Sequence, residues 1–502
     1  MRGPIAGRRP ARRRGLRLNW GVIVPVLSGA AMAVGVGMLV CAAVALAYDD
    51  GSALAFGATG GVVAPLGLLG LRAGRRLTTG PLRARDGYFA VTAAWVLAAT
   101  LGAIPFLAAG TFGSPVDAFF ESMSGFSGCG ATLINDVEAE PHGILLWRSL
   151  THYLGGVGIV LLIVAIAPAT GLASQRLFFT ESSAPITERL TPRIADTAKI
   201  IWGVYVTLTV LGISALLIAG MPAFDAVNHA LSGVATGGFS TRTKSIGQFD
   251  SLAIELVTMG ILLGSGVSLL FYWRLLKRRD IRPQLSEVMT FLAIVAVATA
   301  VVTASVLVSG DVDTFGGALR ASVFSVVSLI TSTGFVTVDF DQFNDVARVV
   351  LIGGSFVGAC AGSTAGGLKV VRVMLLARTG LQEIQRQIQP QAVQVLRIPG
   401  KVFGEDVRRT VLGFFLLYMT VFGLGSLAML VAGLDFLTAI TSASSALTLG
   451  GAGLGGVGAT ENFTAVPPGG RVILPVLMLI GRLEVFTVVA LLTPVFWRRQ
   501  WA

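Results

Sequence analysis

Long apolar segments alternate with short polar connections along almost the whole chain. A helix needs about 20 apolar residues to cross a bilayer. Ten segments approach or exceed this length, at 20–47, 52–71, 88–110, 145–168, 199–220, 252–276, 286–309, 347–376, 408–432 and 472–497. The pattern predicts an all-α polytopic membrane protein with both termini on the same side.

Four of the connections, at 111–144, 221–251, 310–346 and 433–471, depart from this pattern. Each contains a half-length apolar segment of roughly 10–14 residues, which is too short to span. Each half-length segment then enters a glycine-bearing turn. The turn glycines are Gly130, Gly238, Gly334 and Gly451.

The four glycines recur at intervals of roughly 100 residues, which indicates an internal repeat. Each repeat holds a span, a half-length helix, a turn and a second span, and the first two spans of the chain are additional. We therefore expect a basic cytoplasmic N-terminus at 1–18, two extra transmembrane helices at 19–86, and pore repeats at 87–170, 198–280, 284–380 and 405–502.

Composition and charge refine this picture. The chain is 54% hydrophobic and has a net charge of +11. The basic residues gather in alternate connections, beginning with the arginines of residues 1–17 and continuing at 72–85, 274–282 and 369–409. Such clusters mark cytoplasmic segments by the positive-inside rule. The charge therefore indicates membrane topology, and we expect no nucleic-acid partner.

Few residues suited to catalysis or metal binding lie inside the spans. The three cysteines have neither disulfide nor metal-ligand spacing. The histidines His142, His152 and His229 are scattered, so we expect them to be polar packing groups. A membrane enzyme would need a cluster of polar residues within the spans, and the sequence predicts that this chain is not an enzyme.

The four glycine turns predict a pore. Non-helical backbone at membrane depth is tolerated only where it is buried in protein or lines a watery cavity. A half-length helix entering from outside directs its partially negative C-terminal end toward the membrane centre, where it favours a cation. Glycine-containing turns can then offer carbonyl oxygens in place of the hydration shell of an alkali cation. For a single turn, a helix-packing surface or an extracellular hairpin is the alternative.

Three further motifs carry a resemblance to a known family. They are "LWRSLTHYLGGVGIVLLIVAIAP" at 146–168, "ACAGSTAGGLKVVR" at 359–372 and "GRLEVFTVVALLTPVFWR" at 481–498. With the turns, they resemble the second spans of the Trk/Ktr/HKT superfamily of potassium transporters over residues 88–498. The two additional N-terminal spans resemble the Trk-type branch, to which TrkH-like membrane subunits belong.

This resemblance implies four span, pore-helix, span repeats around one pseudo-fourfold pore that takes up K⁺, with no organic cofactor. It also implies a homodimer in the lipid of the bacterial inner membrane, with both termini cytoplasmic. The family's membrane subunit works with a cytoplasmic nucleotide-binding regulatory subunit of the TrkA/KtrA kind, so the same partner is expected here.

The resemblance assigns the K⁺-binding backbone carbonyls residue by residue. The expected filter residues are Ser127, Gly128, Cys129, Gly130, Thr236, Gly237, Gly238, Ser332, Thr333, Gly334, Leu449, Gly450 and Gly451. The first turn departs from the family pattern at Ser127, Gly128 and Cys129, and the fourth at Thr448 and Leu449. Cys129 can alternatively be a buried filler.

An interrupted stretch at 361–369 is expected to form an intramembrane gating loop. Its expected residues are Gly362, Ser363, Thr364, Gly366, Gly367 and Lys369. Close helix packing is the alternative for these small residues. The sequence argues against a phosphate loop, because Leu368 separates the last glycine from the lysine and no strand precedes it.

Charged residues complete the predicted site. Arg482 and Glu484 lie deep in the last span, where a lone charge costs ~2.5–3.5 kcal/mol. The resemblance implies that Arg482 repels cations below the filter; the alternative is a buried ion pair. Asp117 and Glu121 are expected to attract cations to the outer mouth, although Asp117 can instead cap its helix.

Other functions remain open on the sequence. A transporter of the same fold can pass sodium or couple transport to Na⁺ or H⁺. An unrelated secondary transporter would also use broken helices, but its repeats are usually inverted halves.

Overall fold

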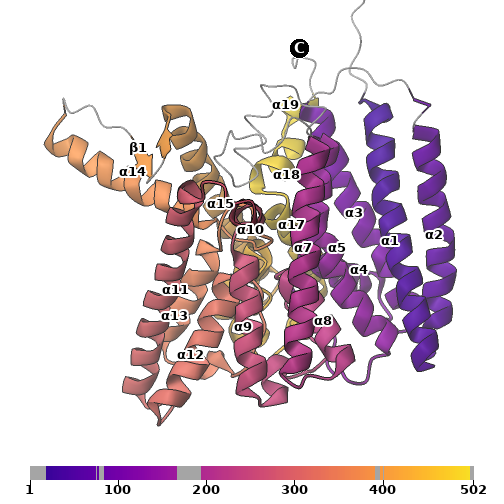
Figure 1. Cartoon of the computed structure of the whole chain (residues 1–502), viewed down its shortest axis with the longest axis horizontal. Helices are drawn as coiled ribbons and strands as arrows, with labels where there is room; N and C mark the ends of the chain where they lie inside the picture. Colours follow the sequence, from indigo (N-terminus) through magenta and orange to yellow (C-terminus); the bar gives the residue numbers. More distant parts are fainter. Residues whose placement is uncertain are drawn as a thin grey trace, which may run out of the picture.

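The computed structural model describes residues 18–74, 76–77, 84–166, 194–390, 396–398 and 401–497. Almost all of the expected basic N-terminus lies outside this range. Within it the long helices stand side by side as a bundle (Figure 1). They are α1 (Trp20–Tyr48), α2 (Ala53–Gly74), α3 (Ala84–Ala108), α5 (His142–Ile166), α7 (Ile194–Ile218), α11 (Arg282–Ser309) and α15 (Glu405–Val431).

Six of the described helices are long and apolar enough to cross a membrane. A seventh span results if α9 (Leu252–Gly266) and α10 (Leu269–Leu276) are counted together, although they meet at 90°. Apolar side chains such as Leu46 and Ile218 are exposed on the outside of the bundle. This apolar exterior suits a lipid environment and agrees with the predicted polytopic membrane protein.

Two predicted spans are wrong as continuous helices. The span expected at 252–276 breaks between α9 and α10, and the span expected at 472–497 breaks after α17 (Pro468–Arg482), before α18 (Val485–Leu492) and α19 (Pro494–Trp497). Our sequence interpretation missed both breaks, although the first follows the small residues Gly264, Ser265 and Gly266 and the second lies between the charged residues Arg482 and Glu484.

A third interruption, expected from the sequence, separates α13 (Asp345–Val357) from α14 (Val370–Ile388). Backbone groups that lose their helical hydrogen bonds at the first and third breaks bond to each other. Cys360 N–H donates to Gly266 O at 3.0 Å, and Leu269 N–H donates to Gly362 O at 3.2 Å. The interruptions at 267–268 and 358–369 therefore stabilise each other.

Four short helices lie inside the bundle, one in each repeat. They are α4 (Pro115–Ser127), α8 (Ala223–Val234), α12 (Phe315–Ile330) and α16 (Phe436–Thr448). The side chains of Ser114, Thr314 and Asp435 cap the N-termini of three of them by accepting from backbone N–H groups. None is long enough to cross a bilayer. Each ends at one of the glycine turns.

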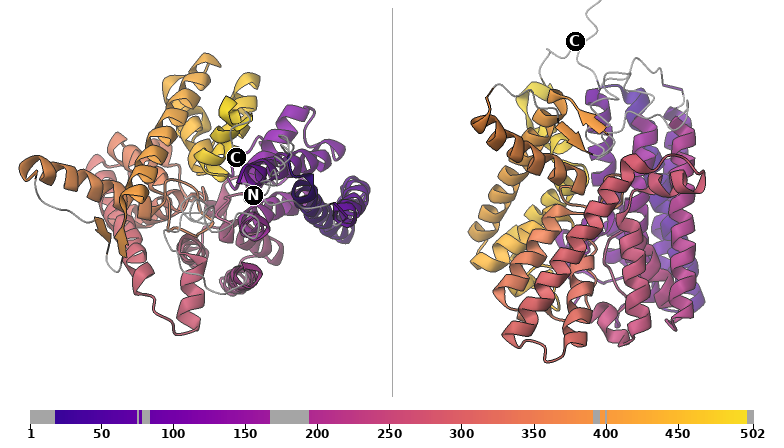
Figure 2. Two further views of the ribbon diagram at one scale, coloured as in Figure 1. Left: turned by 90° about the horizontal axis from the view of Figure 1, so that it is seen from above. Right: turned by 60° about the vertical axis from the view of Figure 1, so that its left-hand side comes forward.

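Packing of the short helices closes a ring. Each contacts the two flanking helices of its own repeat and one helix of the preceding repeat. The contacts between repeats are α4 with α17, α8 with α5, α12 with α9 and α16 with α13. The repeats therefore follow one another around a common axis, as seen from above in Figure 2. This arrangement confirms the predicted pseudo-fourfold fold.

The remaining elements lie at the margins of this ring. Helices α1 and α2 pack on each other, and α1 continues the contact to α3 and α5. A small antiparallel hairpin of β1 (Leu396–Ile398) and β2 (Lys401–Phe403) precedes α15. Short 3₁₀ turns are η1 (Ser245–Phe249), η2 (Phe340–Gln342), η3 (Gly455–Val457) and η4 (Phe463–Ala465).

Candidate functional site: four turns and the loop beside them

The four glycine turns share one backbone pattern, with two left-handed residues in each. The second left-handed residue is always the repeated glycine, with φ between 72 and 86° at Gly130, Gly238, Gly334 and Gly451. The first lies two positions earlier, with φ between 53 and 76° at Gly128, Thr236, Ser332 and Leu449. A left-handed conformation costs roughly 1–2 kcal/mol for residues other than glycine. Gly128 therefore adopts the left-handed conformation without strain, whereas Thr236, Ser332 and Leu449 adopt it at this cost.

Each turn is bonded to its short helix in the same way. The residue before the repeated glycine donates its N–H to the carbonyl of a serine near the helix end, at 2.9–3.0 Å. These donor–acceptor pairs are Cys129 with Ser124, Gly237 with Ser232, Thr333 with Ser328 and Gly450 with Ser445. Our sequence interpretation missed the serines, although each stands at the same offset before a repeated glycine.

The turns also contact one another in a closed cycle. A Cβ placed on any repeated glycine would collide with a carbonyl oxygen of the neighbouring turn. The contacts run from Gly130 to Gly237 O, from Gly238 to Thr333 O, from Gly334 to Gly450 O, and from Gly451 to Cys129 O. The ring therefore leaves no room for a side chain at these positions. The four carbonyls in these contacts belong to equivalent residues of the four turns. A ring of such carbonyl oxygens is the set of donors that a dehydrated alkali cation requires.

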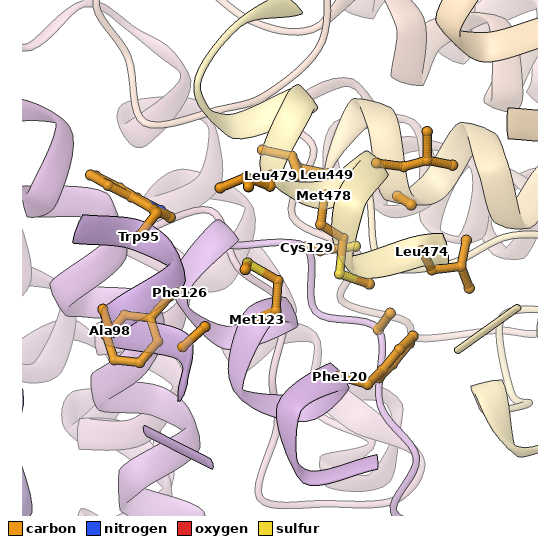
Figure 3. Close-up of a cluster of buried hydrophobic side chains, with 14 of the residues drawn as sticks. Trp95, Ala98, Phe120, Met123, Phe126, Cys129, Leu449, Leu474, Met478 and Leu479 are labelled. Carbon is orange, nitrogen blue, oxygen red and sulfur yellow. The ribbon is translucent and has the colours of Figure 1, made fainter. Parts of the chain in front are cut away.

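The unusual side chains of the first and fourth turns are part of the hydrophobic core. Cys129 and Leu449 are 0% and 1% exposed. Both pack in a cluster with Met123, Leu474 and Met478 (Figure 3). The Cys129 thiol lies 3.5 Å from Ser445 O, and all three cysteines are free and buried. Cys129 is therefore a filler behind the turn, and its carbonyl is the group that reaches the ring.

The loop between α13 and α14 packs directly on two of the turns. Thr364 Oγ1 donates to Val234 O at 3.1 Å and lies 3.3 Å from Thr236 Oγ1. A Cβ on Gly366 would collide with Thr448 O. The loop thus contacts the ends of α8 and α16, in the second and fourth repeats. Of the expected loop residues, Thr364 and Gly366 come closest to the turns.

The rest of the loop is bonded to helix α11 and to itself. Ala361 N–H donates to Glu287 Oε1 on α11 at 2.6 Å, and Ser363 Oγ donates to Cys360 O at 2.7 Å. Lys369 has φ 75° and donates from Nζ to Ser363 Oγ and Ala365 O. The lysine side chain therefore folds back on the loop and closes it.

Arg482 joins the loop to two repeats. Its guanidinium is buried and donates to Thr364 O at 3.0 Å and to Gly155 O at 2.7 Å. Its Nη1 lies 3.8 Å from the position that a Cβ on Gly128 would take. Arg482 therefore stands beside the loop and close to the first turn. This placement brings together the loop and the predicted pore charge.

Glu484 has a different partner from Arg482. Its Oε2 accepts from Arg372 Nη2 at 2.7 Å, and the Arg372 guanidinium lies 4.1 Å from the centre of the Phe414 ring. Glu484 has φ 59° at the break between α17 and α18. The carboxylate therefore links this break to the start of α14.

The two mouth acids have structural partners, which corrects their expected role. Glu121 is 0% exposed and accepts from Arg148 Nε at 3.0 Å, from Thr132 Oγ1 and from Leu133 N–H. Asp117 accepts twice from Arg471 Nη1 at 3.0 Å. Ser114 caps α4, so Asp117 is not the cap either. Because arginines neutralise both carboxylates, neither acts as a free attractor for cations.

At the exposed start of the fourth short helix, Asp435 caps α16. Its carboxylate accepts from Thr438 N–H at 3.1 Å. Hydrogen bonds from Thr438 lower the pKa of Asp435 below its ordinary value. The cap is therefore charged at neutral pH, which suits the positive end of the helix dipole. Among the described residues, no cluster of three His, Cys, Asp or Glu side chains could hold a metal ion.

Comparison with known proteins places this architecture in a family. The TrkH family, described as cation transport proteins, matches residues 68–495. The Trk system potassium uptake protein TrkH of Halomonas elongata is 39% identical over 91% of this chain and 95% of its own length. The protein of the same name from Escherichia coli K12 is 37% identical over 95% of this chain and 98% of its own length.

The structural comparison agrees. The crystal structure of the potassium transporter TrkH from Vibrio parahaemolyticus superposes with a TM-score of 0.86 and 35% identity, covering 95% of this chain and 99% of that one. This family consists of transporters, which confirms that the chain is not an enzyme. The chain, a multi-pass membrane protein, belongs to the TrkH family of cation transport proteins.

Proposed function

We propose that this chain takes up potassium through the ring of four glycine turns. The observation that carries the proposal is the closed cycle in which each repeated glycine meets a carbonyl of the next turn. Four equivalent carbonyls at the ends of four helices can replace the hydration shell of K⁺. The partially negative C-terminal helix ends add a favourable field for a cation. Relatives named as potassium uptake proteins support this choice of ion.

The filter is built from the residues that the sequence predicts, with their backbone carbonyls as ligands. The cation passes without covalent chemistry, so the chain's contribution is to hold the carbonyls at a fixed separation and to exclude water. A sodium-permeable or Na⁺/H⁺-coupled transporter is the alternative on the same fold. The departures at Cys129 and Leu449 leave the backbone pattern of the turns unchanged, which favours potassium.

The loop of residues 358–369 serves as the gate. Thr364 and Gly366 pack on the second and fourth turns, and Arg482 fixes Thr364 O in that position. In this arrangement a cation leaving the ring meets the loop and the positive charges of Arg482 and Lys369. The gate opens when α14 draws the loop aside. Release requires breaking the hydrogen bonds of Thr364 and Arg482 together.

A cytoplasmic regulatory subunit of the TrkA kind moves this gate, since α14 leads from the loop to the cytoplasmic face. Relatives carry names of the Trk system, whose membrane proteins include TrkH, TrkG and TrkI. The chain works as a homodimer in the bacterial inner membrane with both termini in the cytoplasm. The membrane potential drives K⁺ inward, and K⁺ is the transported ion without an organic cofactor.

Uptake of K⁺ by cells that lack their own potassium systems tests this function. Cells are assayed with and without sodium for the natural chain, Gly130→Ser and the matched control Gly57→Ser. Gly130 has no room for a side chain, whereas nothing lies within 4 Å of a Cβ on Gly57. We expect potassium-selective uptake from the natural chain and the control, and its loss in Gly130→Ser. Equal uptake by all three at matched membrane levels contradicts the filter.

A second assay tests the gate. Gly366 packs against Thr448 O, and Thr364 holds the loop to α8. Thr364→Val removes that hydrogen bond while keeping the size of the side chain. We expect a higher K⁺ leak from Thr364→Val in proteoliposomes without any partner subunit. An unchanged leak, with normal folding, removes the loop from the proposed gate.

A further inference from the structure

Two residues on one face of α5 contact the aromatic ring of Phe239, next to the second turn. Phe239 directly follows Gly238 and is 2% exposed. The His152 ring stacks on one side of it, with centroids 4.1 Å apart and planes 18° apart. The Arg148 guanidinium lies 4.2 Å from the same centroid. His152 and Arg148 are one helical turn apart, so α5 presents both toward the turn.

His152 also contacts the backbone of the second turn. Its Nδ1 lies 2.9 Å from Ser232 Oγ, and Ser232 O accepts the N–H of Gly237. A Cβ on Gly237 would collide with the imidazole. Because Gly237 supplies one carbonyl of the ring, the imidazole directly contacts the backbone of a residue proposed to bind the ion. Its Nε2 is buried without a hydrogen-bond partner among the described atoms.

Arg148 extends the contact to the first repeat. Its Nη1 donates to Ser240 O at 3.0 Å and its Nη2 donates to Thr132 Oγ1 at 3.1 Å. Its Nε donates to Glu121. Thr132 and Ser240 follow the first and second turns respectively. The arginine therefore fixes the spacing between these two turns, while His152 supports the second turn from behind.

These contacts are more specific than core packing requires. A buried guanidinium costs several kcal/mol unless its hydrogen bonds are satisfied, and an aliphatic side chain would fill the same space. The stacked imidazole and the guanidinium together restrain the Phe239 ring. In the third turn, the equivalent Phe335 contacts His229 more loosely, with centroids 5.5 Å apart and planes 43° apart.

We propose that His152 and Phe239, restrained by Arg148, are positioning residues that set the selectivity of the filter between K⁺ and Na⁺. This inference rests on the proposed potassium uptake and names a support for the second turn. The pair acts through Gly237 and Ser232 and does not touch the ion. Loosening the support lets the Gly237 carbonyl move inward, so that the ring can also coordinate the smaller Na⁺.

The test compares Na⁺ and K⁺ fluxes through purified protein in proteoliposomes. We expect His152→Ala and Phe239→Leu to lower the K⁺/Na⁺ flux ratio about tenfold, which corresponds to roughly 1.4 kcal/mol of discrimination. Most of the change should lie in a higher Na⁺ flux, with K⁺ flux retained. The conservative His152→Gln can still bond Ser232 and should recover a large part of the ratio.

Phe56→Leu is the matched control, because Phe56 is a fully buried aromatic that packs on Trp147 of the same helix α5. It should lower thermal stability without changing the flux ratio. The inference is overturned if His152→Ala keeps the K⁺/Na⁺ flux ratio of the natural chain, or if Phe56→Leu changes the ratio equally. Either result leaves the proposed potassium uptake unaffected. Failure of the natural chain and Phe56→Leu to prefer K⁺ would instead reject the proposed function.

Discussion

The first and third turns reach the same backbone geometry by different means. In the third turn, Thr331 Oγ1 and Thr333 Oγ1 bond each other at 2.8 Å, and Ser328 Oγ donates to Phe335 O at 2.7 Å. The first turn instead has Gly128 and the buried Cys129. Its main polar support is the ion pair of Glu121 and Arg148 outside the turn.

The difference shows that conformation, rather than side-chain identity, is the shared requirement. A residue with a side chain reaches left-handed φ at some cost, and hydrogen bonds within the third turn offset the strain of Ser332. Gly128 avoids that strain, so the first turn needs fewer bonds of its own. Its chain must still be held in place, and the neighbouring helix α5 supplies that support.

The largest expected effect comes from adding a side chain at the position that both turns keep as glycine. Gly334→Ala places a Cβ against Gly450 O and should reduce K⁺ uptake more than 100-fold, since at least about 3 kcal/mol of strain or displacement results. Gly128→Ser is the contrasting change, because the third turn carries Ser332 there. Uptake by Gly128→Ser should fall less, by about 5- to 30-fold at most, because a serine there meets no close contact and costs only roughly 1–2 kcal/mol of backbone strain. Equal losses of K⁺ uptake in the two variants would contradict the prediction that only the repeated glycine has no room for a side chain.

The ion pair that supports the first turn is the next target. Glu121→Gln leaves Arg148 as a buried charge without its carboxylate, which costs about 3–5 kcal/mol. We expect a clearly lower melting temperature in detergent. Glu255→Gln breaks a comparable pair with Arg320, whose side chain is 40% exposed, and should cost much less. Similar melting temperatures for the two variants would show that burial does not determine the effect.

The hydrogen bond inside the third turn has a smaller expected effect. Thr333→Val keeps the shape but removes the bond to Thr331, which is worth about 1 kcal/mol. The K⁺/Na⁺ flux ratio should fall about fivefold. Cys129→Val, at the equivalent position of the first turn, should change the ratio less than twofold, since the thiol makes only a 3.5 Å contact. A larger change of the flux ratio in Cys129→Val than in Thr333→Val would show that the first turn depends more on its side chain than the third.

The smallest effect is expected at the N-termini of the short helices, where the first and fourth use different caps. Asp435→Ala should lower stability by about 1 kcal/mol, as for other lost N-caps. Because hydrogen bonds lower the pKa of Asp435 from 3.8, its contribution is present well above that unfolded value and is lost as the pH falls through the lowered value. Unfolding measured between pH 7 and 3 checks this. Asp435→Asn, which caps without charge, should show a weaker pH dependence.

Much of the architecture could be read from the chain itself. The half-length apolar segments and the recurring glycines predicted four equivalent units, and the structure brings their turns into contact. The interruption near Gly362 was also visible, because small residues gather there. The breaks at Val267 and Leu483 were missed, because the average hydropathy of each span stays high although small residues surround the first break and two charged residues flank the second.

Charged residues were located by the sequence but not paired by it. Asp117 and Glu121 looked like free acids at a pore mouth, yet their arginine partners lie on other helices. Arg482 and Glu484 are neighbours in sequence and have separate partners in space. His152 looked like an isolated polar group until Phe239 was placed against it.

The sequence by itself determined the membrane class, the repeat and the backbone character of the turns, because these depend on local composition and on glycine at fixed intervals. Only the tertiary structure decided which carbonyl each glycine meets, which turns the loop contacts and which arginine neutralises each acid. Those contacts join residues from different repeats. Their identity follows from packing around the ring, which no local pattern records.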